Sequence, residues 1–192
     1  MSEQIDAAPT LARGGKYAQV ERERRFLLAA APSEGITRMR QITDRYLLGT
    51  RLRLRRVSDL DTGSCVLKFT QKLPAEQPGA VQGLITNTYL SPAEYDLLAT
   101  LPAAVLSKTR LSVPPLGVDV FDPPLHGLVL AEAEFETDEQ ARSFRPPLTP
   151  VAEVTDDPRF TGGSLVQAHR HDLLAWLADY GIEPGIEPGP RE

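Results

Sequence analysis

The sequence predicts a mainly β domain of the α+β class, with about eight strands and a few helices. Short runs in which apolar and charged residues alternate are spread along the chain, and a period of two residues is typical of strands. Clusters of Gly, Pro, Asp and Ser separate these runs and are typical of turns. Only two or three stretches carry helix signals. Together these observations predict a fold dominated by strands.

The first predicted strand, residues 20–28, carries charge on both of its faces. Successive side chains of an extended strand point to opposite sides, so Glu21, Glu23 and Arg25 share one face while two other arginines occupy the opposite one. Such a strand is a poor wall for an apolar core. It can face water, or it can line a wet cavity that holds a metal ion and an anion.

Two of the next strands present basic faces. Residues 36–48 are interpreted as one long strand or as two short ones broken near Asp44. The strict alternation that follows predicts a strand with three arginines on one face, namely Arg51, Arg53 and Arg55. After a predicted hairpin turn, the strand at residues 64–72 places three polar side chains on one face, namely Lys68, Thr70 and Lys72.

The second half of the chain mixes strands with short helices. A helix over residues 91–101 is predicted because Ser91 can cap it, a proline follows, and Glu94 completes a capping box. Further helices are expected at residues 138–144 and 164–180. Further strands are expected at residues 84–90, 105–113, 117–121, 128–136 and 151–155.

Two of these later strands also carry like charges on one face. One is basic, with Lys108 and Arg110, and one is acidic, with Glu132, Glu134 and Glu136. Like charges directly opposite each other destabilise a sheet, so these faces need counter-charge or a ligand. Arginine and lysine bind phosphate, and clustered glutamates bind hard cations such as Mg²⁺ or Mn²⁺. A closed barrel with both sets inside would hold a polyphosphate and its metal together.

That arrangement has a consequence for the outside of the barrel. Inward-facing charge turns the apolar faces outward, and the helices at residues 91–101 and 164–180 are suitable covers for them. Asp119 could enter the interior from its strand or lie at an edge. The alternative interpretation is that each charged face is simply the solvated side of a half-buried sheet.

Length and composition fit one domain. We expect a loose leader at residues 1–15, the domain at residues 16–181, and a Gly/Pro-rich tail at residues 182–192. The single cysteine excludes an internal disulfide and a cysteine-based zinc site. A net charge of −5 argues against nucleic-acid binding, and no signal or membrane-spanning pattern is visible, so a cytoplasmic protein is expected.

Several motifs, in order, resemble the CYTH domain of the triphosphate tunnel metalloenzymes. The first strand is similar to the ExExK signature at Glu21, Glu23 and Arg25. The similarity spans roughly residues 17–180. The later motifs that carry it are Arg53 with Arg55, Thr70 with Lys72, Lys108 with Arg110, Glu132 with Glu134, and Glu153 with Thr155.

The resemblance implies an eight-stranded antiparallel tunnel that binds a triphosphate and Mg²⁺ or Mn²⁺. The implied metal ligands are Glu21, Glu23, Glu132, Glu134 and Glu153. The implied phosphate ligands are Arg53, Arg55, Lys72, Lys108 and Arg110, with Arg51 and Lys68 in second rank. The implied catalytic set is Glu21, Glu23, Arg25 and Lys72. The chain departs from the signature at Arg25, where the family has Lys, and arginine does not replace a compact, titratable ammonium group.

Three functions of different kinds fit this tunnel. The first is metal-dependent hydrolysis of the terminal phosphoryl group of tripolyphosphate, thiamine triphosphate or a nucleoside triphosphate. The second is a class IV-like adenylyl cyclase, and the third is a non-catalytic module that binds polyphosphate or nucleotides. The sequence leaves the substrate, the preferred metal and the oligomeric state open.

Overall fold

The computed structural model describes residues 16–183, and these residues form one antiparallel sheet that closes into a barrel. The leader expected at residues 1–15 and most of the expected tail lie outside this range. The strands are β1 (Gln19–Leu27), β2 (Arg38–Leu47), β3 (Leu52–Asp59), β4 (Cys65–Pro74), β5 (Val81–Tyr89), β6 (Ala103–Val113), β7 (Leu116–Phe121), β8 (Val129–Glu134) and β9 (Ala152–Glu153). The helices are α1 (Pro92–Leu98), α2 (Asp138–Ser143), the 3-10 turn η1 (Pro158–Phe160), α3 (Gly162–Leu165) and α4 (Arg170–Ala178).

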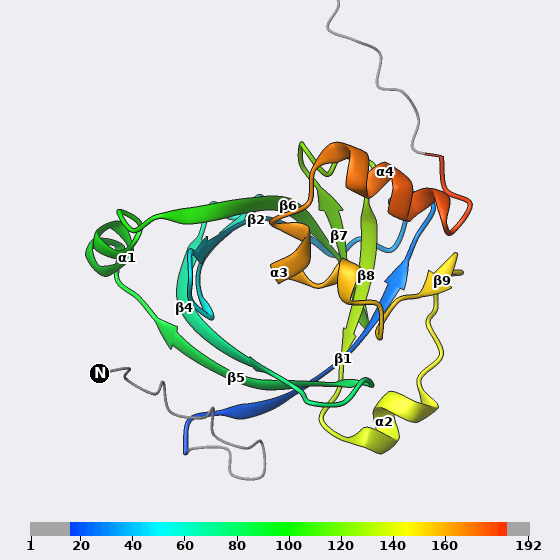
Figure 1. The fold of residues 1–192 in the computed structure, drawn as a ribbon, viewed down its shortest axis with the longest axis horizontal. Coiled ribbons are helices and arrows are strands. Elements are labelled where there is room, and N and C mark those ends of the chain that lie inside the picture. The colour runs from blue at the N-terminus through cyan, green and yellow to red at the C-terminus, as the bar shows by residue number, and fades with distance from the viewer. Residues whose placement is uncertain (1–15, 184–192) are drawn as a thin grey trace, which may run out of the picture.

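The barrel closes because β1 pairs with both ends of the sheet. The strand order is β5-β4-β3-β2-β6-β7-β8-β1-β9, and β1 also pairs with β5. Figure 1 shows the strands curving round into a ring. Gly83 lies opposite a bulge in β1, with a φ of +135°, and a Cβ there would fall 2.0 Å from the Leu73 carbonyl oxygen. The predicted closed, mainly β barrel is confirmed, with β9 as an additional short strand beside β1.

Alternation along the strands separates a charged interior from an apolar exterior. In β3, Leu54 faces outward and is fully buried, while Arg53 and Arg55 face inward. Leu54 packs with Leu47 and with Tyr95 of α1 in one outer cluster. The predicted helix near residues 91–101 therefore covers this part of the exterior, as Figure 1 shows for α1.

The second outer cluster has a cover that the sequence did not predict. It includes Phe26, Val118 and Val129, and Phe144, directly after α2, packs against it. The stretch at residues 164–180 was expected to be one helix and, together with the helix at residues 91–101, to cover the outward apolar faces. Instead it forms two helices, α3 and α4, because α4 begins anew at His169, whose backbone N–H donates to the Asp172 carboxylate at 2.9 Å.

The α3–α4 segment packs against the end of the barrel at which β1 finishes. Leu173 and Leu177 of α4 are fully buried there, in one cluster with Leu27 of β1. Tyr46 packs against the same cluster, and a Cβ added to Gly162 of α3 would lie 2.2 Å from its hydroxyl oxygen. The inward-facing strand residues of this cluster are Leu27, Leu106, Phe121 and Leu130. Apolar side chains of β1, β2, β6, β7 and β8 therefore pack with α3 and α4 at this end, which we call the blind end, and the opposite end is the mouth.

None of the helices within residues 16–183 is long and apolar enough to cross a bilayer.

Candidate active site

Strands β1 and β8 together form an acidic wall inside the barrel. Their register pairs Glu23 with Glu134 and Arg25 with Glu132. Glu21 lies two residues before Glu23, on the same face and nearer the mouth. Glu23 is only 8% exposed, whereas Glu134 is exposed at the end of its strand. Four of the five predicted metal ligands therefore lie on one side of the interior.

Glu23 and Glu132 are two carboxyl groups of the acidic wall whose pKa values shift in opposite directions. Burial, then the charge of Glu132, raises the pKa of Glu23 to about 8. Burial acts in the same direction on Glu132, but Arg110 and then Lys108 hold the pKa of Glu132 below its usual range. Of these two groups, Glu132 is paired with a cation, whereas the negative charge of Glu23 is not fully compensated by the protein. A bound cation would supply the missing charge.

The opposite side of the interior is basic. Strands β3, β4 and β6 bring six predicted phosphate ligands or second-rank ligands inside, and β2 lies between β3 and β6. These residues are Arg53, Arg55, Lys68, Lys72, Lys108 and Arg110. Acidic and basic sets that are far apart in the sequence therefore meet within one barrel.

Two buried aspartates neutralise part of this basic wall. Asp119 is fully buried, accepts two bonds of 2.6 Å from Arg110, and also pairs with Lys108. Asp44 accepts from Arg55 at 2.6 and 2.7 Å and lies 3.5 Å from Arg53. Asp119 thus enters the interior, one of the two positions that its strand allowed. Asp44 was not singled out, and it lies in one unbroken strand rather than at a break.

Three interior arginines each keep one buried donor atom without an acceptor. The Nε atoms of Arg25, Arg40 and Arg53 are buried and make no hydrogen bond among the described residues. Burial, then repulsion by Arg110, lowers the pKa of Arg40, a residue that sequence reasoning missed. Buried donors without acceptors are costly, so these groups fit an anionic ligand.

Lys72 joins the two walls. Its ammonium nitrogen donates to both Glu21 carboxylate oxygens, at 2.7 and 2.8 Å. The Lys72 side chain is partly exposed, so it can exchange a carboxylate for a phosphate oxygen at little cost.

Arg25, which replaces the lysine of the CYTH signature, is held by the protein itself. Its Nη2 donates to the Thr155 carbonyl oxygen at 2.7 Å and to the Gln82 side chain at 2.9 Å. Its Nε lies 3.8 Å from Glu23. Arg25 therefore ties the acidic wall to the segment after β9, and it is less free than a lysine to move a proton.

Two predicted residues are not brought into this site. Glu153 pairs with Arg24 on the outer face of β1, with a shortest distance of 2.6 Å, and so lies apart from the other four carboxylates. Arg51 is exposed just before β3 begins, and its guanidinium makes no ion pair with any described residue. We leave both out of the proposed site.

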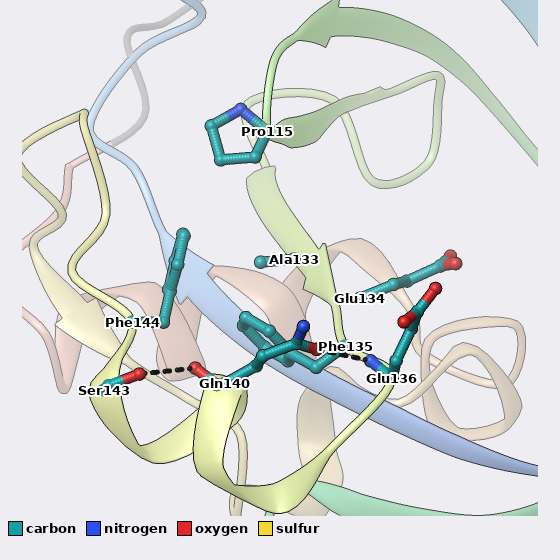
Figure 2. A pocket seen from close by; sticks show the side chains of 8 residues that line it. All are labelled: Pro115, Ala133, Glu134, Phe135, Glu136, Gln140, Ser143 and Phe144. Atoms are coloured by element: carbon teal, nitrogen blue, oxygen red, sulfur yellow. Dashed lines mark hydrogen bonds between the residues drawn. The ribbon is translucent and has the colours of Figure 1, made fainter.

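A hollow outside the barrel adjoins the acidic wall near the mouth. It is bounded by α2, by Pro115 at the β6–β7 turn, and by Phe135 after β8. Figure 2 shows the Glu134 and Glu136 carboxylates together on one side of it, away from Phe144. Glu134 is the lining residue that also belongs to the acidic wall. The hollow is therefore a neighbour of the site and not its centre.

The interior donors fit a divalent cation in their chemistry, although they are not pre-arranged around one. Within residues 16–183, no three His, Cys, Asp or Glu side chains are grouped as a ready metal site. Glu21 is engaged by Lys72 and Glu132 by Arg110. The uncompensated Glu23 beside Glu132 is the feature that fits a metal, since oxygen ligands with excess negative charge are those that Mg²⁺ and Mn²⁺ prefer.

Comparisons with known proteins support the fold through structure alone. No model of a known protein family matches the sequence, and no curated protein matches it. A crystal structure of the inorganic triphosphatase NE1496 is similar, with 25% identity and a TM-score of 0.52 over 78% of this chain and 96% of that chain. A second structure of NE1496, described as a hypothetical protein, has 26% identity and a TM-score of 0.51 over 78% and 99%. The chain thus has a triphosphatase-like barrel fold.

The buried Asp44 gives the protein a defined acid sensitivity. The pKa of Asp44 is lowered to about 2 because Arg55 outweighs the effect of burial. A depressed carboxyl pKa stabilises the fold above the ordinary value of about 4, and this stabilisation, about 2 kcal/mol, is lost as the pH falls towards 2. We expect the melting temperature to drop steeply over this interval. An Asp44→Asn variant, already destabilised at pH 7, should show a shallower drop; an equally steep one would contradict this assignment.

Proposed function

We propose that the chain hydrolyses the terminal phosphoryl group of inorganic triphosphate or of a small organic triphosphate inside the barrel, with Mg²⁺ or Mn²⁺. The observation that carries the proposal is the meeting of an acidic wall with buried, partly uncompensated arginines in one interior. Phosphoryl transfer depends largely on positioning and charge neutralisation, which such an interior supplies. The likeness to the inorganic triphosphatase NE1496 supports the same reaction class.

The proposed roles follow the placement of the side chains. Arg40, Arg53 and Arg55 would bind phosphate oxygens, because guanidinium forks match their geometry. Lys72 would exchange Glu21 for a phosphate oxygen. Glu21, Glu23, Glu132 and Glu134 would hold the metal, which when bound supplies charge neutralisation and orients water. Apolar packing at the blind end excludes bulk water from that side of the substrate.

The test is a substrate panel. Purified protein is given tripolyphosphate, thiamine triphosphate or ATP with Mg²⁺, Mn²⁺ or EDTA, and released phosphate and cyclic AMP are both measured. We expect phosphate release from at least one triphosphate, dependent on the metal. Cyclic AMP from ATP would instead favour the cyclase, and tight tripolyphosphate binding without turnover would favour a binding module. No turnover of any substrate by folded protein would refute hydrolysis.

A further inference from the structure

Tyr89 combines an interior orientation with high exposure. It ends β5, and the sheet register places it opposite Lys68, which faces the barrel interior. The Lys68 ammonium lies 5.5 Å from the centre of the Tyr89 ring. The tyrosine is nevertheless 69% exposed. One part of the ring thus contacts an interior cation, and the rest is open to solvent.

This tyrosine lies at the mouth of the barrel. The start of β1 pairs with Ile85 of β5, whereas the end of β1 belongs to the blind end. Tyr89 lies four residues beyond Ile85, further from the blind end. It therefore borders the end of the barrel at which the interior is not lined by apolar side chains.

Lys68 connects the ring to the basic wall. It makes no ion pair with any carboxylate in the described part of the chain. Burial, then the charges of Arg55 and Arg53, lowers the pKa of its ammonium group. The surroundings of Lys68 therefore carry an excess of positive charge. A phosphate beside it would be stabilised by Lys68, Arg53 and Arg55 together.

Asn87 adds a polar edge beside the ring. It lies two residues before Tyr89, on the same face of β5, and is exposed. Its amide oxygen accepts a 2.8 Å bond from the buried Thr70 hydroxyl. This contact fixes the amide orientation and leaves its N–H groups directed elsewhere. A ring, an amide donor and an unpaired cation thus follow one another from the mouth inward.

We propose that Tyr89 is a specificity-determining residue that stacks on the planar aromatic group of an organic triphosphate, such as a nucleoside triphosphate. The phosphates then extend past Lys68 to Arg55, and Asn87 donates to the edge of the stacked group. The inference rests on the proposed function and narrows its substrate class. Because every base has a π face, stacking selects bases as a class and not one base.

The test compares affinities without turnover. Calorimetric Kd values are measured in EDTA, which prevents metal-dependent turnover, for the β,γ-imido analogue of ATP and for tripolyphosphate. Loss of one base–aromatic contact should weaken the analogue about tenfold in Tyr89→Ala. Tyr89→Phe, which keeps the ring, and Thr88→Ala, on the outward face of the same strand, should bind like the parent protein. Tripolyphosphate should bind all four proteins equally, with equal melting temperatures in the absence of ligand.

Three outcomes would overturn the inference. The first is an unchanged affinity of Tyr89→Ala for the analogue, and the second is no binding of the analogue by the parent protein. The third is an equal loss for tripolyphosphate, which would mean that the ring only supports Lys68. Failure of the proposed hydrolysis is recognised separately, as absence of phosphate release by the parent protein, and it does not affect the comparison of affinities.

Discussion

Replacing Glu23 with Gln should reduce metal-dependent phosphate release by on the order of 100-fold or more. Glu23 is buried beside Glu132, and burial with that neighbouring charge raises its pKa to about 8. A metal would therefore bind there in place of a proton. Gln keeps the shape of the side chain and removes the charge, and loss of a metal's charge stabilisation amounts to several kcal/mol. The measurement is the initial rate against metal concentration.

The matched control for this variant is Glu153→Gln. Glu153 resembles a metal ligand in its sequence motif, yet its carboxylate pairs with Arg24 on the outer face. We expect its rate and metal dependence to stay within about twofold of the parent protein, as for a surface ion pair. If Glu153→Gln lost activity while Glu23→Gln kept it, the acidic wall would not be the metal site.

Replacing Asp119 with Asn should lower the free energy of unfolding by about 3–5 kcal/mol, because removing one partner leaves buried cations uncompensated. Asp119 is fully buried and is shared by Lys108 and Arg110. The comparison is Asp138→Asn, which breaks an exposed surface pair with Arg22 and should change the free energy of unfolding far less. Urea denaturation measures both values.

The same variant also reports on anion binding. With Asp119 neutral, Lys108 and Arg110 become available to a ligand, so tripolyphosphate should raise the melting temperature of Asp119→Asn more than that of the parent protein. A loss of stability without this larger ligand effect would mean that the two cations do not face the anion. A variant as stable as the parent would contradict the buried charge network itself.

The closed barrel was implied by the resemblance of the motifs, whereas strand alternation predicted which side chains share a face, because a period of two assigns each side chain to one side of the sheet. Alternation placed Arg53 and Arg55 on the face opposite Leu54, and the structure turns that leucine outward beneath α1. The capping box at Ser91 likewise predicted the start of that helix, since the residues that make it are adjacent in sequence.

What alternation could not supply was register between strands. Asp44 interrupts a run of mixed residues, and only its pairing with Arg55 across β2 and β3 shows why a carboxylate is needed there. Arg40 was overlooked for the same reason. Only the register shows that it lies opposite Arg110 of β6 and so belongs to the basic wall. Glu153 matched a motif, but its short strand β9 pairs with β1, and its carboxylate contacts Arg24, whose side chain points away from the barrel interior.

The apolar packing at the blind end makes the two ends of the barrel chemically different. Leu27 and its apolar neighbours occupy the interior beneath α3 and α4, whereas charged side chains line the interior towards the mouth. A polyanion that binds as proposed would therefore be favoured at the mouth, and a long polyphosphate would present its terminus to the interior.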